Sequence, residues 1–150
     1  MPYKYWKRED EKAVKTVRSY AKLCEVAMRI LARIKVPVGF VCGPISTGGA
    51  GSPKKNIVIF KRYIAKLREE GKNIFSQIPF EETLWRLSAL FGNDPDKLLR
   101  EFYLPLFATG LLTTFYFIPG WETSYGARWE HNQAKRLGIQ IIYLEEAHNE

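Results

Sequence analysis

The feature that most constrains the fold of this chain is a regular alternation of short apolar runs with longer segments of helical periodicity. The apolar runs are residues 36–42, 73–76, 113–118 and 139–144. Strands that alternate with helices favour a parallel sheet covered by helices on both faces. The run at 113–118 is apolar, β-branched or aromatic throughout, as expected of a strand that is covered on both sides. We therefore expect an α/β fold with four parallel strands.

Helices are expected between the strands, and their ends carry recognisable signals. Residues 10–34 predict one long amphipathic helix added before the sheet, with an apolar stripe formed by Val17, Ala21, Cys24, Met28, Leu31 and Ile34. Ser52 and Pro53 begin a second helix, and Gly71 ends it. Further helices are expected at about 81–91, 95–107 and 124–137. This pattern is typical of a small doubly wound sheet of the flavodoxin-like kind.

The net charge of +7 is concentrated in the first 35 residues, which contain ten Lys and Arg against four acids. We therefore expect a basic N-terminal helical extension at 1–35 and a nearly neutral α/β domain at 36–150. The basic helix is suited to phosphate contacts with nucleic acid, to an anionic membrane surface, or to packing against the domain or a second subunit. No recognised nucleic-acid-binding motif supports the first function, so we favour packing or dimerisation.

Composition and cysteine usage narrow the class of protein. With 46% hydrophobic and 26% charged residues, the chain is globular rather than disordered, collagen-like or built on disulfides. Cys24 and Cys42 form no CxxC pair, and we interpret them as ordinary thiols of a reducing compartment, which predicts a cytoplasmic protein. Residues 102–121 contain no charge but are interrupted by proline and glycine. They predict a helix end, a turn and a buried strand rather than a membrane span.

The two histidines give no sign of a metal site. His131 and His148 are far apart and have no acids or cysteines at ligand spacing, so we expect neither a metal nor another cofactor. His131 follows Glu130 directly and is therefore turned by about 100° around the helix, which predicts a surface position. His148 lies in a polar tail.

Ligands of open parallel sheets bind at the carboxyl ends of the strands. We therefore expect the functional residues in the loops after the first and third strands. The first loop runs from Gly43 to Gly51. Its glycines allow backbone amides to approach a phosphate closely. Its spacing matches neither a P-loop nor a dinucleotide fingerprint. Ligand binding and a flexible crossover connection are both compatible with this sequence.

The second loop, residues 119–130, is more specific. Ser124 is placed to cap the following helix, and its hydroxyl and the neighbouring amides are suited to an anion. Gly126 and Glu130 are four residues apart and therefore share one face of that helix. Because Gly126 has no Cβ, a ligand has room above the Glu130 carboxylate, which then suits a nucleophile or base. The alternative interpretation of Glu130 is an ordinary exposed helical glutamate.

Together these loops resemble the two signatures of the nucleoside 2-deoxyribosyltransferase superfamily, which includes the 2′-deoxynucleoside 5′-phosphate N-hydrolases. In this chain, Cys42-Gly43-Pro44-Ile45-Ser46 resembles the first signature. The segment Ser124-x-Gly126-x-x-x-Glu130, which follows an apolar strand, resembles the second. The resemblance covers roughly residues 36–144 and looks closest to a branch of small relatives.

The resemblance implies cleavage or transfer at the N-glycosidic bond of a (deoxy)nucleoside or nucleoside 5′-monophosphate. Glu130 corresponds to the nucleophile that attacks the anomeric carbon and displaces the base, as in a retaining glycosidase. Ser124 corresponds to a serine near the 5′ end of the nucleotide. Gln77 follows the second strand and therefore faces the same cleft, and the aromatic rings of Trp121 and Tyr125 are suited to stacking on a base. The expected substrate-binding residues are Gly43, Pro44, Ile45, Ser46, Gln77, Trp121, Ser124, Tyr125 and Gly126.

One acid of the family pattern has no counterpart at its usual place, because residues 104–118 contain no Asp or Glu. Glu101 is the nearest upstream acid and the expected second catalytic residue, with Glu81 and Glu82 as alternatives. If none of them replaces the missing acid, the protein binds nucleotides without cleaving them. The expected partners are a nucleoside or nucleotide and a second copy of the chain, in a homodimer or higher homo-oligomer. Neither nucleic acid nor a membrane is expected.

Overall fold

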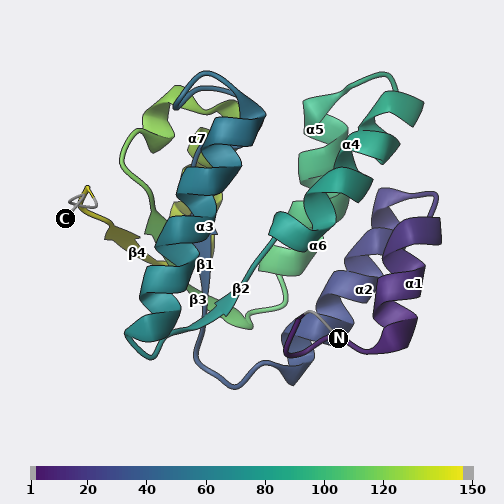
Figure 1. Ribbon diagram of the computed structural model, residues 1–150, viewed down its shortest axis with the longest axis horizontal. Helices are drawn as coiled ribbons and strands as arrows, with labels where there is room; N and C mark the ends of the chain where they lie inside the picture. The colour runs from purple at the N-terminus through teal and green to yellow at the C-terminus, as the bar shows by residue number, and fades with distance from the viewer. Residues whose placement is uncertain (1–2, 147–150) are drawn as a thin grey trace. The chain divides into compact units, whose positions relative to one another are not determined.

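The computed structural model describes residues 3–146, so His148 lies outside the described residues. All four predicted strands are present, and helices occupy the predicted intervals (Figure 1). The elements in chain order are α1 (Arg8–Thr16), α2 (Tyr20–Arg33), β1 (Val38–Cys42), α3 (Pro53–Glu69), β2 (Asn73–Phe75), η1 (Ile78–Phe80), α4 (Glu81–Leu90), α5 (Pro95–Leu98), η2 (Leu99–Tyr103), α6 (Leu104–Phe107), β3 (Leu112–Phe117), η3 (Trp121–Thr123), α7 (Tyr125–Leu137) and β4 (Gln140–Tyr143).

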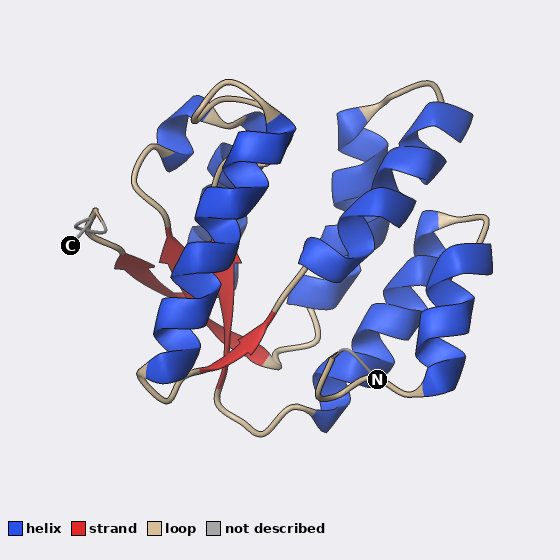
Figure 2. Ribbon diagram, viewed as in Figure 1, coloured by secondary structure: helices blue, strands red, loops and turns tan. Residues whose placement is uncertain are grey.

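The four strands form one all-parallel sheet in the order β2-β1-β3-β4, drawn in red in Figure 2. The connections through α3 and α7 step in opposite directions across the sheet, and right-handed crossovers then place these helices on opposite faces. Figure 1 shows α3 in front of the sheet and α7 behind it. The predicted small doubly wound α/β sheet is therefore confirmed. The strand order reverses between β1 and β3, where ligand sites of such sheets lie.

The strands form where the sequence has apolar runs because β1 and β3 are the central strands. Every residue of β1 is buried, and the Phe40 ring packs against Phe75 at 6.4 Å and Phe115 at 5.2 Å between centroids. Gly39 is required by packing, since a Cβ there would lie 2.6 Å from a ring carbon of Tyr116. The edge strand β4 is less buried, and its Tyr143 is exposed.

The chain divides into two compact units. The sheet unit contains residues 36–76 and 112–150, and the helical unit contains residues 1–35 and 77–111. The expected boundary after residue 35 coincides with a unit boundary. The segment 77–111, which we expected within the α/β domain, instead groups with the N-terminal helices.

The single helix expected at 10–34 is wrong, because the segment forms two helices. Val17 ends α1 with extended backbone (ψ 146°), and the Ser19 hydroxyl begins α2 by accepting the Lys22 amide at 3.1 Å. A serine hydroxyl that accepts a backbone amide at a helix start replaces the carbonyl that would accept this amide in a continuous helix. The helix is therefore interrupted before Ser19. The buried face of α2 also differs from the expected stripe: Ala21 is exposed and Met28 half-buried, while the buried residues are Tyr20, Leu23, Cys24, Val26, Ala27, Ile30 and Leu31.

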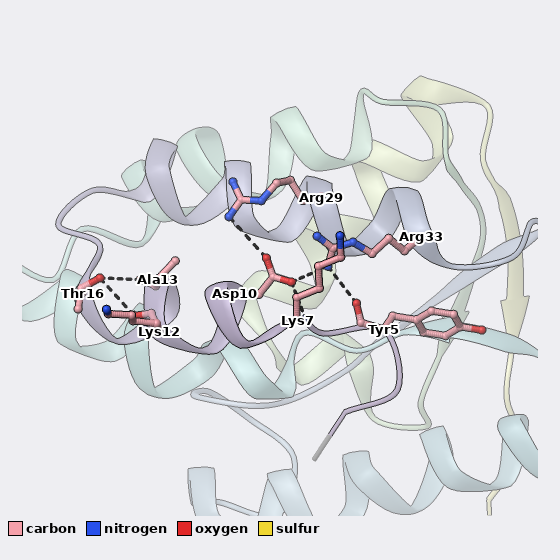
Figure 3. Close-up of polar contacts among 8 residues, drawn as sticks. All are labelled: Tyr5, Lys7, Asp10, Lys12, Ala13, Thr16, Arg29 and Arg33. Carbon is pink, nitrogen blue, oxygen red and sulfur yellow. Dashed lines mark hydrogen bonds and ion pairs between the residues drawn. The ribbon is translucent and has the colours of Figure 1, made fainter. Parts of the chain in front are cut away.

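Asp10 joins α1 to α2 at the centre of an ion-pair cluster (Figure 3). Its buried carboxylate accepts the Lys7 amide at 2.8 Å, pairs with Arg33, and lies 3.5 Å from a guanidinium nitrogen of Arg29. Burial by itself raises the pKa of Asp10, but the hydrogen bonds from Arg33 and Lys7 and the two guanidinium charges outweigh burial and lower it. Two of the basic residues that give this segment its charge therefore stabilise its fold.

The basic segment packs against residues of its own chain within the helical unit. Packing of this kind is one of the roles that the sequence left open for it. The Cys24 thiol donates to the carbonyl of Phe102 at 3.3 Å, and the Thr83 hydroxyl donates to the carbonyl of Val14 at 2.8 Å. Both contacts join α1 or α2 to residues 77–111. The basic helices thus belong to the core of this unit.

The uncharged stretch 102–121 contains the end of α6, a turn and the buried strand β3, as predicted. Among residues 3–146, every helix is too short or too polar to cross a membrane.

Candidate active site at the ends of β1 and β3

Glu130 lies on α7 and is only 7% exposed, so its interpretation as an exposed helical glutamate is wrong. Its charge acts on the buried thiol of Cys42, the last residue of β1. Burial, followed by the charge and the hydrogen bond of Glu130, raises the pKa of Cys42 well above its usual value. The thiol therefore stays protonated at neutral pH. The structure places a buried carboxylate at the strand ends where the sequence predicted chemistry.

The two loops of the sequence motifs hold each other through two threonine hydroxyls. The Gly49 amide donates to Thr123 Oγ1 at 2.8 Å, and that hydroxyl donates to the carbonyl of Gly120 at 2.7 Å. In the reverse direction, the Tyr125 amide donates to Thr47 Oγ1 at 3.1 Å. The loops after β1 and β3 therefore form one hydrogen-bonded structure, which we call the threonine clamp.

The glycine-rich first loop is anchored to α3 by the buried side chain of Asn56. Its Nδ2 donates to the carbonyls of Ile45 at 2.9 Å and Gly48 at 3.2 Å, and its Oδ1 accepts the Ala50 amide at 2.8 Å. Gly49 has φ +61°, and a Cβ there would lie 2.6 Å from Asn56 Oδ1, so this position needs glycine. The loop thus has a defined set of partners, unlike the flexible connection that the sequence allowed.

The N-terminus of α7 is formed as predicted but is already occupied by the chain's own hydroxyls. The Ser124 side chain accepts the Ala127 amide at 3.3 Å, which confirms the predicted cap. The neighbouring Tyr125 amide is bonded to Thr47. At Gly126 an added Cβ would meet nothing within 4 Å, so this face of the helix has open space beside it. That a ligand occupies this space stays a prediction.

The aromatic residues of this region cluster around His131. Trp121 stacks on the imidazole at 4.3 Å between centroids, and His131 Nε2 lies 2.6 Å from the hydroxyl of Tyr143 on β4. The predicted surface position of His131 is therefore wrong: the side chain points away from the Glu130 face but toward β4, and it is 8% exposed. Burial lowers the pKa of His131, as does the charge of Lys135.

The other predicted binding residues of the sheet unit differ in exposure. Gly43 and Pro44 are buried, Ile45 is half-buried, and Ser46 and Tyr125 are exposed. A Cβ at Gly43 would lie 3.0 Å from side-chain carbons of Ile118, so the glycine permits close packing of the two strand ends.

Gln77 and the acids named as partners of Glu130 belong to the helical unit. Gln77 is buried, whereas Glu101 is partly exposed and forms an ion pair with Lys97 at 2.7 Å. Glu82 is exposed. Glu81 is buried, and its carboxyl accepts the Tyr103 hydroxyl at 3.4 Å. Burial raises the pKa of Glu81 to about 7, against the smaller opposite effect of Tyr103. Of these acids, Glu81 has the environment that is typical of a functional carboxyl.

Sequence reasoning missed Asn56 and the two clamp threonines. Asn56 carried a signal, because it is a polar residue on the stripe of α3 that also contains Phe60, Ile64 and Leu67. Thr47 and Thr123 carried none, since nothing local marks a threonine that bonds across the fold. Within the described part of the chain, no group of three or more His, Cys, Asp or Glu side chains is arranged to hold a metal ion.

The fold and this site define an α/β protein with a buried carboxylate at the switch point of a doubly wound sheet. Residues 107–143 match the family described as a domain of unknown function, DUF4406. The match spans β3, the second loop, α7 and β4, and therefore includes Ser124, Gly126 and Glu130. No curated protein and no solved structure matches the chain.

Proposed function

We propose that this protein cleaves or transfers at the N-glycosidic bond of a (deoxy)nucleoside or nucleoside 5′-monophosphate, with Glu130 as nucleophile. The observation that carries the proposal is the buried Glu130 carboxylate at the end of β1, beside two motif loops that are joined by the threonine clamp. The resemblance of both loops to the nucleoside 2-deoxyribosyltransferase superfamily supplies the reaction class. The match to DUF4406 covers the second of these loops.

In this reaction a Glu130 oxygen forms a bond to the anomeric carbon while the bond from that carbon to the base nitrogen breaks. The electron pair of the broken bond leaves with the base, which takes up a proton. Water or a second base then attacks the anomeric carbon and releases Glu130. Open space beside Gly126, on the same face of α7, gives the sugar room to approach.

The direct test is to incubate the purified chain with a panel of nucleosides and their monophosphates and to measure free base by chromatography. We expect release by the unmodified protein and by Glu122→Gln, a matched control on an exposed glutamate of the second loop. In Glu130→Gln we expect a loss of at least about 10³-fold, because the amide is a poor nucleophile. Release of no base, or equal release by Glu130→Gln, would contradict the proposal.

The second catalytic acid stays a prediction. If Glu101 protonates the leaving base, Glu101→Gln lowers kcat and removes the alkaline limb of the pH–rate profile. If it acts only in its ion pair with Lys97, kcat and the profile stay unchanged. The same measurement on Glu81→Gln tests the buried alternative.

A non-catalytic nucleotide-binding protein is the second candidate, favoured by the absence of any acid in residues 104–118. Thermal stabilisation by nucleotides without release of base would support this function. An unchanged melting temperature with every nucleoside and nucleotide would count against both candidates.

A further inference from the structure

Helix α3 carries a concentration of positive charge that the nearly neutral total of residues 36–150 conceals. The segment 43–68 contains six Lys and Arg and no Asp or Glu. The remaining residues of 36–150 contain seven Lys and Arg against twelve acids. The excess of positive charge in this part of the chain therefore belongs to α3.

Five of the six cations lie on the outward face of α3, which packs its other side against the sheet (Figure 1). The sixth, Arg68, donates to the carbonyl of Ile74 at 3.0 Å. Spacings of four and seven residues bring side chains to the same side of a helix. At 1.5 Å per residue, the cations extend over about 18 Å of helix. We call this surface the α3 basic face, and its exposed residues are Lys54, Lys55, Lys61, Arg62 and Lys66.

The charge of the α3 basic face is presented to solvent. Within the described part of the chain, none of its five side chains forms an ion pair with an acid. The basic N-terminal segment differs, because Arg29 and Arg33 are used in pairs with Asp10. Cations that are not compensated by the fold are suited to an anionic partner.

The apolar residues of α3 argue against a membrane as this partner. Phe60, Ile64 and Leu67 are buried, and Val58 is the large apolar residue of α3 that is exposed. A helix that binds a membrane surface inserts a whole apolar face into the lipid. The apolar side of α3 is already packed in the fold, so its outward face offers charge with little to insert.

The aromatic residues of α3 argue for a duplex rather than a single strand of nucleic acid. Proteins that bind single strands stack the bases on aromatic side chains. Both rings of α3, Phe60 and Tyr63, are buried. A duplex presents about one phosphate charge per 1.7 Å of its axis, and lysine binds phosphate as a point charge that needs no stacking.

We propose that the α3 basic face binds the phosphate backbone of a nucleic-acid duplex. Contacts to phosphates carry no sequence information, so the binding is independent of sequence. The inference goes beyond the proposed function and uses no residue of the candidate active site. It revises the expectation of no nucleic-acid partner, which placed the excess charge in residues 1–35.

Binding is measured by fluorescence anisotropy with the full chain and a labelled DNA duplex of mixed sequence. About four phosphate contacts give a slope of about −4 in the logarithm of affinity against that of salt concentration. We therefore expect Kd to rise at least about a hundredfold between about 50 and 200 mM salt. A duplex of scrambled sequence should bind equally well. Absence of binding at the lower salt concentration would overturn the inference.

The face is tested by neutralising two of its cations and, as a matched control, two exposed cations of α1. Lys61→Gln combined with Arg62→Gln should weaken binding at least about tenfold and reduce the salt slope by about 2. Lys12→Gln combined with Lys15→Gln removes the same net charge and should change the affinity little. All four side chains are exposed, so both variants should fold, which circular dichroism checks. Equal losses in the two variants would show that total charge, not this face, is responsible.

The other anionic partners are outcomes of the same measurement. Tighter binding of a single strand than of the duplex would overturn the choice of a duplex. Binding to vesicles of phosphatidylserine and phosphatidylcholine without binding to DNA would overturn nucleic acid as the partner. Glu130→Gln should bind the duplex as the unmodified protein does, so the proposed function and this inference stand or fall separately.

Discussion

Asp10 in the helical unit and Glu130 in the sheet unit are both buried helical carboxylates, but their surroundings differ. Asp10 pairs with Arg33 and Arg29 and accepts the Lys7 amide, so its charge is matched by cations of its own fold. The charge of Glu130 acts on the thiol of Cys42, and Glu130 shares its helix face with the open position Gly126. The comparison teaches that burial alone does not identify a functional carboxylate. The open position on the same helix face separates Glu130, the acid proposed to react, from Asp10, the acid that stabilises its fold.

The sharpest way to break this comparison is to change both acids to amides. Glu130→Gln should lose at least about 10³-fold of turnover, or roughly 4 kcal/mol of transition-state stabilisation. Asp10→Asn should leave kcat of the folded protein unchanged. Base release and circular dichroism check the two outcomes together. An active Glu130→Gln, or a folded Asp10→Asn without activity, would reverse the roles assigned to the two acids.

A third buried acid sharpens the comparison through pH. The pKa of Glu81 is raised to about 7 in the fold from 4.5, so folding favours its protonated form. The stabilisation from the protonated Glu81 is fully present below the pKa of the unfolded chain and is lost as pH rises through the pKa of the folded protein. The free energy of unfolding should fall by about 3 kcal/mol over this range. Glu81→Gln should therefore be more stable than the unmodified protein at pH 8 but not at pH 4.

Urea denaturation at both pH values measures this difference. Glu101→Gln is the matched control, because it removes a partly exposed carboxylate of the same unit. If Glu81→Gln keeps the same loss of stability between pH 4 and pH 8, then another group is responsible.

Removing the charge of Asp10 should have the next largest effect, a loss of about 2 kcal/mol in the free energy of unfolding. Breaking a fully buried pair costs about 3–5 kcal/mol, and partial exposure of the two arginines reduces that figure. The pKa of Asp10 is lowered, so the stabilisation is present at neutral pH and is lost in acid. Denaturation of Asp10→Asn at pH 7 tests this, and an unchanged stability would show that the pair is not needed.

The smallest expected effect concerns the threonine clamp. Thr47→Val keeps the shape of the side chain but leaves the Tyr125 amide without its hydroxyl partner, which should cost about 1 kcal/mol. Ser46→Ala, at an exposed neighbouring residue, should change stability by less than about 0.5 kcal/mol. Equal melting temperatures for Thr47→Val and the unmodified protein would mean that the clamp does not stabilise the loops.

The sequence predicted the sheet well because buried parallel strands require continuous apolar runs, as in β1 and β3. It predicted the starts of α3 and α7 because Ser52 and Ser124 cap them locally. It missed the break before Ser19, where a serine inside an apolar periodicity competes with the helix. The capping serines could be recognised where a loop leads from a strand into a helix. At Ser19 the surrounding apolar periodicity favoured a continuous helix, so the cap was not recognised.

Contacts between distant segments explain the errors at the site. The position of Gly126 and Glu130 on one helix face follows from spacing, so this part of the site was predicted. His131 was correctly turned away from that face, but the presence of Tyr143 there depends on the place of β4 in the strand order. The two hydrogen bonds of the clamp join residues that are separated by 74 and by 78 positions in the chain. Nothing in either local sequence records such a pairing.

The most direct measurement of the central claim is intact-protein mass spectrometry after rapid acid quench of the enzyme with its best nucleoside substrate. We expect a protein population heavier by one covalently bound sugar, with peptide mapping placing the adduct on Glu130. The adduct should be retained in Asp10→Asn and absent from Glu130→Gln. Base release by the unmodified protein together with an adduct that persists in Glu130→Gln would contradict the assignment of Glu130 as nucleophile.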